Sequence, residues 1–461
     1  MMRPAHGLLL FPMVVYVLLA VVWYAQRINP ITGDEPHYLL TADSLWRDGD
    51  VQVVNNHQLD TPVLRELPPG AVFTTTHTQN GYSLHGLGLP LLLVPAYAVA
   101  GVLGAKVWLA LLNGLIPLVF YRLARPLGDA RWALAVAVML GLGQPCITAS
   151  SQIYPDLLAG LLILTLVTDW RELEAAQPRA GLVLRSGLLL ALLPWLHLKL
   201  ALPAIILGGF MAGRYWRMGG QGRTLAWRLS LLLAISLSSL GAYQAFAFGS
   251  VLGPYQAGDA TTDGQRIAMI LLGLHLDRLQ GLFFQGPIYL LGVFGLASFF
   301  TKDWPLARLT GLLYLAVMLP NAMHTNWYGG MSFAGRFHWT GALLWSLPLL
   351  AALRQLRAGG HTKVAVGLLV GAGLLQLIVL AKLLIPNGNL YNLPLDEVSA
   401  WTVSNPYADF LALEPWQRAL FLPSFHTVNT YLSAPVNWVA CGVLVVLLVA
   451  GWVGVRKDCR L

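Results

Sequence analysis

Long apolar stretches separated by short polar segments run along most of the chain. A helix that crosses a membrane needs about 20 predominantly apolar residues, and about twelve stretches approach that length. They lie near residues 7–25, 105–121, 132–149, 155–169, 183–197, 199–213, 228–248, 284–301, 307–323, 338–353, 364–385 and 435–455. The pattern predicts an all-α integral membrane protein with about twelve transmembrane helices.

Two further apolar stretches, 86–101 and 267–283, do not fit this alternation. The first contains two prolines, and the second contains Asp277 and Arg278. Counting both as spans would move the basic cluster at 122–131 to the outside, against the positive-inside rule. We therefore expect both stretches to be re-entrant or surface-lying helices at the outer interface.

Basic residues indicate the orientation of the predicted bundle. With a cytoplasmic N-terminus, most of the 29 Lys and Arg residues fall inside and most of the 21 Asp and Glu residues fall outside. We expect a multi-pass protein of the inner (plasma) membrane with both termini cytoplasmic. Segments 26–85 and 386–434 would then be extracytoplasmic. The first apolar stretch lacks a small-residue cleavage site, so we interpret it as a retained helix and not as a signal peptide.

Composition narrows the class of protein. Hydrophobic residues make up 56% of the 461 positions and charged residues only 11%, against about 25% charged in soluble proteins. This balance and a mean hydropathy of +0.62 exclude a cytosolic enzyme and a disordered chain. The net charge is +8, and the basic residues lie in the short connections between apolar stretches. This placement reflects membrane topology, so no nucleic-acid partner is expected. Cys146, Cys441 and Cys459 form no CxxC motif, so neither a disulfide framework nor a thiolate metal site is predicted.

The clearest chemical feature follows the first predicted helix, in the sequence TGDEPHYL from Thr32 to Leu39. Asp34 and Glu35 fall near the outer membrane boundary, where a carboxylate can meet both a lipid headgroup and water. A carboxylate at that depth could act as general base for an incoming hydroxyl. Alternatively, both acids are solvated or cap the helix that Pro36 begins.

A second feature is the glycine-rich sequence NWYGGMSFAGRF at the outer end of the predicted span 307–323. Its small residues permit a tight backbone path that delivers Arg336 to the interface between two apolar spans. A guanidinium there is costly unless it is paired, and a phosphate can pair with it bidentately. Snorkelling, or a salt bridge to an outer acid, is the alternative.

Other polar residues lie in apolar surroundings on the same predicted side. His197 and Lys199 share a short turn between two spans. Asp156 begins a helix after a proline, where an acid commonly has a structural role. Four cationic residues from distant segments are expected to form one anion-binding pocket: His85, Lys199, Arg278 and Arg336.

The sequence contains no GxxxxGK[ST] nucleotide loop and no cytoplasmic Asp-x-Asp signature. An outward-facing enzyme must draw its activated substrate from the membrane. A polyprenyl-phosphate sugar fits, because its tail lies in the bilayer and its phosphate lies at the interface.

These motifs resemble the GT-C superfamily of membrane glycosyltransferases, and the nearest branch contains the protein mannosyltransferases and lipid A aminoarabinose transferases. The resemblance rests on the Asp34–Glu35 pair and on three further motifs. These are His-Gly-x-Gly-x-Pro at 85–90, Tyr-Pro-Asp at 154–156 and Gly-Gly-x-Ser-x-x-Gly-Arg at 329–336. The resemblance covers residues 1–350, which would form the catalytic module, and 351–461 would add C-terminal helices.

The resemblance implies an inverting transfer, at an outward-facing site, from a polyprenyl-phosphate-linked donor, with Asp34 as the base. Glu35 and His37 would orient Asp34 or hold a divalent cation, and no other cofactor is expected. Arg336, helped by Lys199 or Arg278, would stabilise the departing phosphate. The expected substrate-binding residues are His37, Tyr38, Asp156, His197, Trp327 and Tyr328.

The sequence also departs from that branch. His85-Gly86-Leu87 stands where mannosyltransferases usually have His-Pro-Pro or Lys-Pro-Pro, and residues 1–461 show no segment that we expect to form their soluble repeat domain. A glycolipid or polysaccharide acceptor is therefore expected ahead of a protein acceptor. Trp327, Tyr328 and Trp401 would stack on sugar rings, or belong to an interfacial aromatic belt.

Two other functions stay open at this level. A transporter or flippase should show paired interrupted helices in two repeated halves, and no such repeat is evident. A ligase or polymerase for lipid-linked glycans would depend on segment 386–434, including Asp396 and Glu397, and would not need Asp34.

Overall fold

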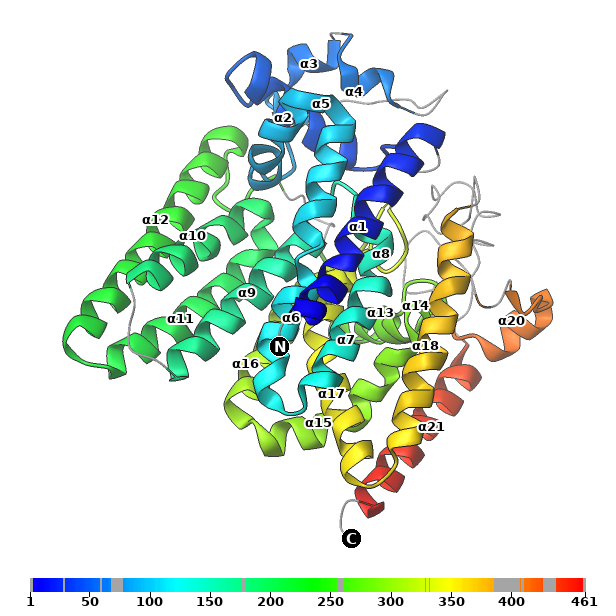
Figure 1. Cartoon of the computed structure of the whole chain (residues 1–461). Coiled ribbons are helices and arrows are strands. Elements are labelled where there is room, and N and C mark those ends of the chain that lie inside the picture. The colour runs from blue at the N-terminus through cyan, green and yellow to red at the C-terminus, as the bar shows by residue number, and fades with distance from the viewer. Residues whose placement is uncertain are drawn as a thin grey trace. The chain divides into compact units, whose positions relative to one another are not determined.

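The computed structural model describes residues 3–27, 30–58, 60–67, 78–175, 180–254, 260–327, 329–330, 332–384, 407, 410–425 and 437–458. These residues are almost entirely helical (Figure 1). One short antiparallel hairpin pairs β1 (Thr78–Gln79) with β2 (Tyr82–Ser83). The prediction of an all-α protein is confirmed.

Six helical segments of the described chain are long and apolar enough to cross a membrane. They are His6–Gln26, Gly88–Leu127, Leu198–Arg217, Gly220–Phe248, Trp304–Met323 and Thr362–Lys382. These segments indicate a membrane protein. The predicted count of about twelve spans is not confirmed, because several predicted spans are shorter apolar helices, namely Ala130–Leu142, Ala180–Leu196, Pro287–Lys302 and Trp438–Gly451.

The chain divides into two compact units, each assembled from separate parts of the sequence. Unit 1 contains 1–12, 116–149 and 258–461, and unit 2 contains 13–115 and 150–257. The predicted boundary at residue 350 falls inside a helix of unit 1.

Unit 2 contains the described residues of segment 26–85 and five long helices. α2 (Glu35–Arg47) packs on α5, and α9, α10, α11 and α12 pack on one another. The remaining bounds are α1 (Arg3–Gln26, from residue 13), α3 (Val54–Gln58), α4 (Pro62–Arg65), α5 (Gly88–Asn113), α9 (Pro155–Ala175), α10 (Ala180–Leu196), η3 (Leu198–Leu200), α11 (Ala201–Arg217) and α12 (Gly220–Phe248).

The α2–α5 contact has a polar centre. Asp43 is fully buried, and its Oδ1 accepts a hydrogen bond from the Tyr97 hydroxyl at 2.8 Å. The same oxygen lies 3.0 Å from Arg47 Nε. A buried carboxylate needs such partners, so this cluster fixes α2 against α5.

The apolar stretch 86–101, predicted to lie apart from the span at 105–121, meets the helix that begins that span at a kink, and the two helical stretches together form α5. α5 runs from Gly88 to Asn113, and only Ala100 and Gly101 depart from helical geometry. Gly101 has φ of +57°, a value that a residue without a Cβ tolerates. The break at these two residues separates the two helical stretches, and the re-entrant or surface-lying position expected for 86–101 stays a prediction.

Unit 1 is built around the close contact of α15 (Leu290–Lys302) with α17 (Trp339–Ala358). Glycines make this contact possible, because a Cβ on Gly295 would stand 1.8 Å from the Pro348 carbonyl oxygen. Its other elements are α6 (Ile116–Ala124), η2 (Arg125–Leu127), α7 (Ala130–Leu142), α8 (Cys146–Ala149), α13 (Gly264–Leu276), α14 (Leu282–Gln285), η4 (Pro287–Tyr289), α16 (Trp304–Met323), η5 (Arg336–His338), α18 (Thr362–Leu383), α20 (Pro415–Phe421) and α21 (Trp438–Asp458).

Candidate functional site

The motif with Asp34 and Glu35 forms the turn into α2. Gly33 has φ of +57°, a left-handed conformation that suits glycine. Asp34 occupies the N-cap position of α2 and is half-buried, but its side chain makes no cap hydrogen bond. The alternative that Asp34 serves as a helix cap is therefore not what the geometry shows.

Glu35 anchors this turn from within unit 2. Its side chain is fully buried. Oε1 accepts the Ile153 amide at 2.8 Å and lies 3.5 Å from Lys106 Nζ, while Oε2 accepts the Thr32 amide at 3.0 Å. Both oxygens hold protein donors, so Glu35 acts as a structural bridge between the turn, α5 and the segment before α9.

Tyr154 holds the backbone on the other side of the turn. Its hydroxyl accepts the Asp34 amide at 3.3 Å and donates to the Thr32 carbonyl at 3.3 Å. The tyrosine is 1% exposed. The Tyr-Pro-Asp motif therefore contacts the acidic motif directly, and the backbone of Asp34 is set by buried groups.

The rings of His37, Tyr38 and His85 lie close together beside the acidic turn. The His85 ring lies 5.4 Å from that of His37 and 4.9 Å from that of Tyr38, measured between centroids. His57 extends the group, at 6.2 Å from His37. Unit 2 thus brings together three of the predicted site residues, His37, Tyr38 and His85, with the element that carries Asp34.

Glycines explain how the segment after His85 reaches this position. A Cβ on Gly86 would stand 2.4 Å from the Trp195 carbonyl oxygen, and one on Gly88 would stand 2.7 Å from the Trp195 carbonyl carbon. Both positions must lack a side chain for the segment to pack against the end of α10. The His-Gly-x-Gly pattern is a close-packing motif at this contact.

Lys199 is held by an acid of the same unit. Its Nζ lies 2.7 Å from Asp156 Oδ1, and both side chains are largely buried, at 10% and 3% exposed. His197 adds a local contact, because its Nδ1 accepts the Lys199 amide at 3.3 Å. Asp156 is therefore the partner of Lys199, the cation of the predicted turn between two spans.

The other predicted cations belong to unit 1. Arg336 is 6% exposed and donates from Nη1 to the Gly329 carbonyl at 3.0 Å. Arg278 is half-buried, and its amide donates to the Pro423 carbonyl at 2.9 Å. Since these two residues and the pair His85 and Lys199 lie in different units, the common anion pocket remains a prediction.

The predicted aromatic contacts lie partly outside the described residues. Trp327 is only 2% exposed, and its ring packs beside Gly273 inside unit 1. It is not presented at the surface of that unit. Tyr328, Trp401, Asp396 and Glu397 fall outside the described residues.

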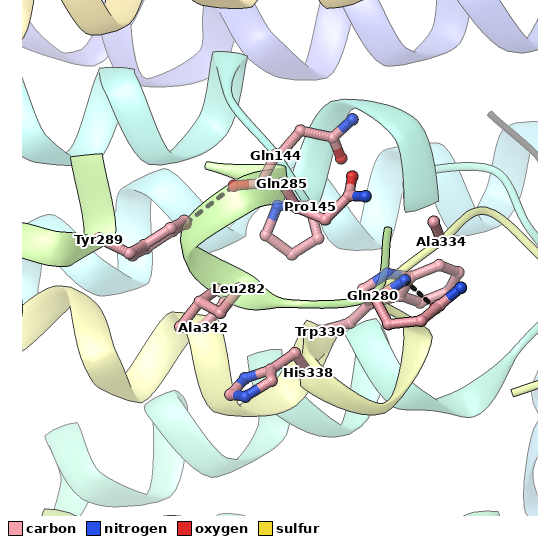
Figure 2. Close-up of a pocket in the computed structure, with 11 residues that line it drawn as sticks. Gln144, Pro145, Gln280, Leu282, Gln285, Tyr289, Ala334, His338, Trp339 and Ala342 are labelled. Atoms are coloured by element: carbon pink, nitrogen blue, oxygen red, sulfur yellow. Dashed lines mark hydrogen bonds between the residues drawn. The ribbon is translucent and has the colours of Figure 1, made fainter. Parts of the chain in front are cut away.

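Unit 1 contains a small cavity, lined by both polar and apolar residues, that the sequence did not indicate (Figure 2). Its volume is about 10 Å³, which is room for about one water molecule. Gln280 Oε1 accepts the Gly335 amide at 2.8 Å, and the Tyr289 hydroxyl donates to the Gln144 carbonyl at 2.9 Å. The lining residues are Gln144, Pro145, Gln280, Leu282, Gln285, Tyr289, Ala334, Gly335, His338, Trp339 and Ala342.

Histidines lie beside this cavity. The rings of His275 and His338 are 4.6 Å apart and nearly perpendicular. His275 Nδ1 lies 2.7 Å from the Leu271 carbonyl and Nε2 lies 2.6 Å from the Tyr314 hydroxyl. Burial lowers the pKa of His275. The neutral ring, with Nδ1 as donor and Nε2 as acceptor, satisfies both contacts.

Within the described residues, no three His, Cys, Asp or Glu side chains are placed to hold a metal ion. Glu35, one of the two predicted metal ligands, has both oxygens engaged by protein donors. The residues present therefore do not fit the divalent cation that the motif suggested.

Sequence reasoning missed the partners of the acidic turn. Lys106 is 2% exposed and lies within the predicted span 105–121. A cation inside an apolar span is a functional signal by itself, and it could have been paired with an outer acid. Tyr154 offered no comparable signal, because tyrosine is common at membrane boundaries.

Comparison with known proteins gives a distant structural likeness. No protein-family profile matches the chain, and no curated protein matches it. The apo crystal structure of the Archaeoglobus fulgidus oligosaccharyltransferase matches with 13% identity and a TM-score of 0.44, over 80% of this chain and 52% of that one. Its complex with Zn and sulfate matches with 14% identity and a TM-score of 0.48, over 88% and 57%.

The chain thus spans about half the length of the solved structures it matches. TM-scores below 0.5 do not assign a fold family. The resemblance to the GT-C superfamily therefore stays a prediction.

Proposed function

We propose that the protein is a membrane glycosyltransferase that moves a sugar from a polyprenyl-phosphate-linked donor to an extracytoplasmic glycolipid or polysaccharide. Asp34 is the proposed general base. The observation that carries the proposal is the half-buried Asp34 on a turn whose backbone is held by buried groups.

The fixed turn suits proton transfer. A general base must be held within hydrogen-bond reach of the proton that it takes. Tyr154 holds the Asp34 amide, and Glu35 holds the amide of Thr32, two residues before Asp34. Glu35 and Lys106 are thus positioning residues for Asp34 in this proposal, in place of a second catalytic carboxylate.

The proposed step is a single displacement. The acceptor oxygen forms a bond to the anomeric carbon while the bond from that carbon to the phosphate oxygen breaks. The hydroxyl proton passes to Asp34, and the electron pair leaves with polyprenyl phosphate. A donor phosphate needs cationic partners, and His85, Lys199, Arg278 and Arg336 are the proposed candidates.

The binding of the acceptor is proposed for the rings behind the turn. His37, Tyr38 and His85 lie in contact beside the acidic motif, where they could hold sugar hydroxyls. Asp156 and His197 are also retained as candidates because they flank the buried Lys199.

The test compares cell-envelope glycans in a deletion strain complemented with wild type, Asp34→Asn or Asp60→Asn at matched protein levels. Asp60 is a suitable control, since it is an exposed acid of the same outer segment paired with Arg65 at 2.6 Å. We expect one glycosyl increment to be lost in the deletion and in Asp34→Asn, and restored by wild type and Asp60→Asn. Full restoration by Asp34→Asn would contradict the role of Asp34.

A further inference from the structure

The described part of the late outer segment has an unusual surface. Residues 410–421 expose five large apolar side chains, at 48–66% of their full area. They are Phe410, Leu411, Trp416, Leu420 and Phe421. Scattered exposed apolar residues are normal on soluble proteins, but a contiguous group marks an interaction surface.

The polar side chains of α20 are less exposed than its apolar ones. Gln417 and Arg418 are half-buried, whereas Trp416 and Leu420, one helical turn apart, are exposed. A helix that lies on a protein in water normally shows the opposite arrangement. The exposed face of α20 therefore suits apolar surroundings.

The backbone ends of α20 are also satisfied by protein groups. The Glu414 amide donates to Gln417 Oε1 at 2.9 Å, and Arg418 Nε donates to the Leu413 carbonyl at 2.7 Å. At the other end, Asn437 Nδ2 donates to the Leu420 carbonyl at 3.0 Å. Such internal pairing is what a segment needs where water is scarce.

The apolar surface continues onto α21, which lies beside α20 in unit 1 (Figure 1). Trp438 and Val439, at the start of α21, are 59% and 66% exposed. Further along this apolar helix, exposed side chains such as Val446 and Leu447 are again apolar. A face that continues from a membrane-type helix points to lipid as its occupant.

We propose that the five exposed apolar side chains of 410–421 insert into the lipid leaflet that meets the N-terminal end of α21, while the exposed Glu414 side chain stays on the water side. Trp416 and Trp438 then lie at the interface, the level that tryptophan favours. This inference is independent of the proposed glycosyl transfer.

The inserted segment is joined to the loop after α13. The Phe425 amide donates to Asp277 Oδ2 at 2.9 Å, and the Arg278 amide donates to the Pro423 carbonyl at 2.9 Å. Asp277 also accepts the Gln280 amide at 2.9 Å. The membrane contact of 410–421 therefore sets the depth of the loop that carries Arg278 and leads to Gln280, which lines the cavity of unit 1.

The experiment places a polarity-sensitive NBD label on Leu420→Cys and Phe421→Cys, with Glu414→Cys as the matched control. Glu414 is an exposed polar position of the same segment. Each variant is made in full-length protein carrying Cys459→Ser, since Cys146 and Cys441 are buried. The proteins are reconstituted in phosphatidylcholine nanodiscs, and quenching by doxyl lipid and by iodide is measured.

We expect doxyl lipid to quench labels at 420 and 421 at least about twofold more than the label at 414, and iodide to show the reverse order. Equally strong iodide quenching of the labels at 414, 420 and 421 would mean that the segment lies in water. Protection of 420 and 421 from both quenchers would mean that protein covers the surface. Either result would overturn the proposal.

Discussion

Glu35 and Lys106 form a buried ion pair whose two members are 0% and 2% exposed. Removing one partner of such a pair leaves an uncompensated charge and costs about 3–5 kcal/mol. By contrast, replacing both partners with uncharged residues can leave the free energy of unfolding nearly unchanged. The pair therefore offers a test of how the acidic turn is held.

We expect Lys106→Met to lower the thermal unfolding midpoint strongly and Glu35→Gln/Lys106→Met to recover most of the loss. The double variant keeps an acceptor for one backbone amide, because the glutamine introduced at position 35 has a carbonyl oxygen. Thermal unfolding in detergent micelles measures the midpoints of the single and the double variant. Arg65→Met, which removes an exposed cation, is the control. Equal loss in the single and double variants would show that charge compensation is not what Lys106 supplies.

At the scale of elements, glycines decide which helices can touch. Gly295 on α15 faces the backbone of Pro348 on α17, and an added Cβ would stand 1.8 Å from its carbonyl oxygen. The Pro348 carbonyl belongs to the backbone of a helix, so it cannot move aside for an added Cβ as a flexible side chain could. In contrast, Gly371 on α18 has open space where a Cβ would stand.

We expect Gly295→Ala to destabilise the protein by about 1–3 kcal/mol through overpacking. Gly371→Ala should cause little change or a slight gain, because alanine favours helix over glycine. Thermal unfolding of the two variants under identical conditions measures the difference. Similar midpoints for both would mean that α15 and α17 are not in close contact.

For the whole molecule, the distribution of charge predicts which connections meet the cytoplasm. Arg214, Arg217 and Arg223 flank the connection between α11 and α12, whereas α2, α3 and α4 follow α1 on the predicted outer side. The positive-inside rule assigns the first connection to the cytoplasm.

We expect an impermeant maleimide to label Gln58→Cys in intact cells and to label Gln221→Cys only after the membrane is opened. Both positions are exposed, so accessibility of the side chain does not differ between them. The reverse pattern would contradict the predicted topology, and with it an extracytoplasmic Asp34.

The sequence by itself determined the helical class and the membrane environment, because long apolar stretches have few ways to satisfy their backbone in lipid. It also determined the acidic motif as a candidate site. The predicted count of about twelve spans is not confirmed, because apolarity does not reveal where a helix ends. Examples are α15, with 13 residues, and α7, with 13 residues.

Only the tertiary structure decided what each polar residue touches. Lys106 is 71 residues from Glu35 along the chain, and Lys199 is 43 residues from Asp156. Spacing in the sequence does not report pairs at such separations. Likewise, the sequence placed 410–421 only within the extracytoplasmic segment 386–434, and its outward apolar face emerges only once α20 packs on α21. Contacts between distant segments are made by packing, so they cannot be predicted from local pattern alone.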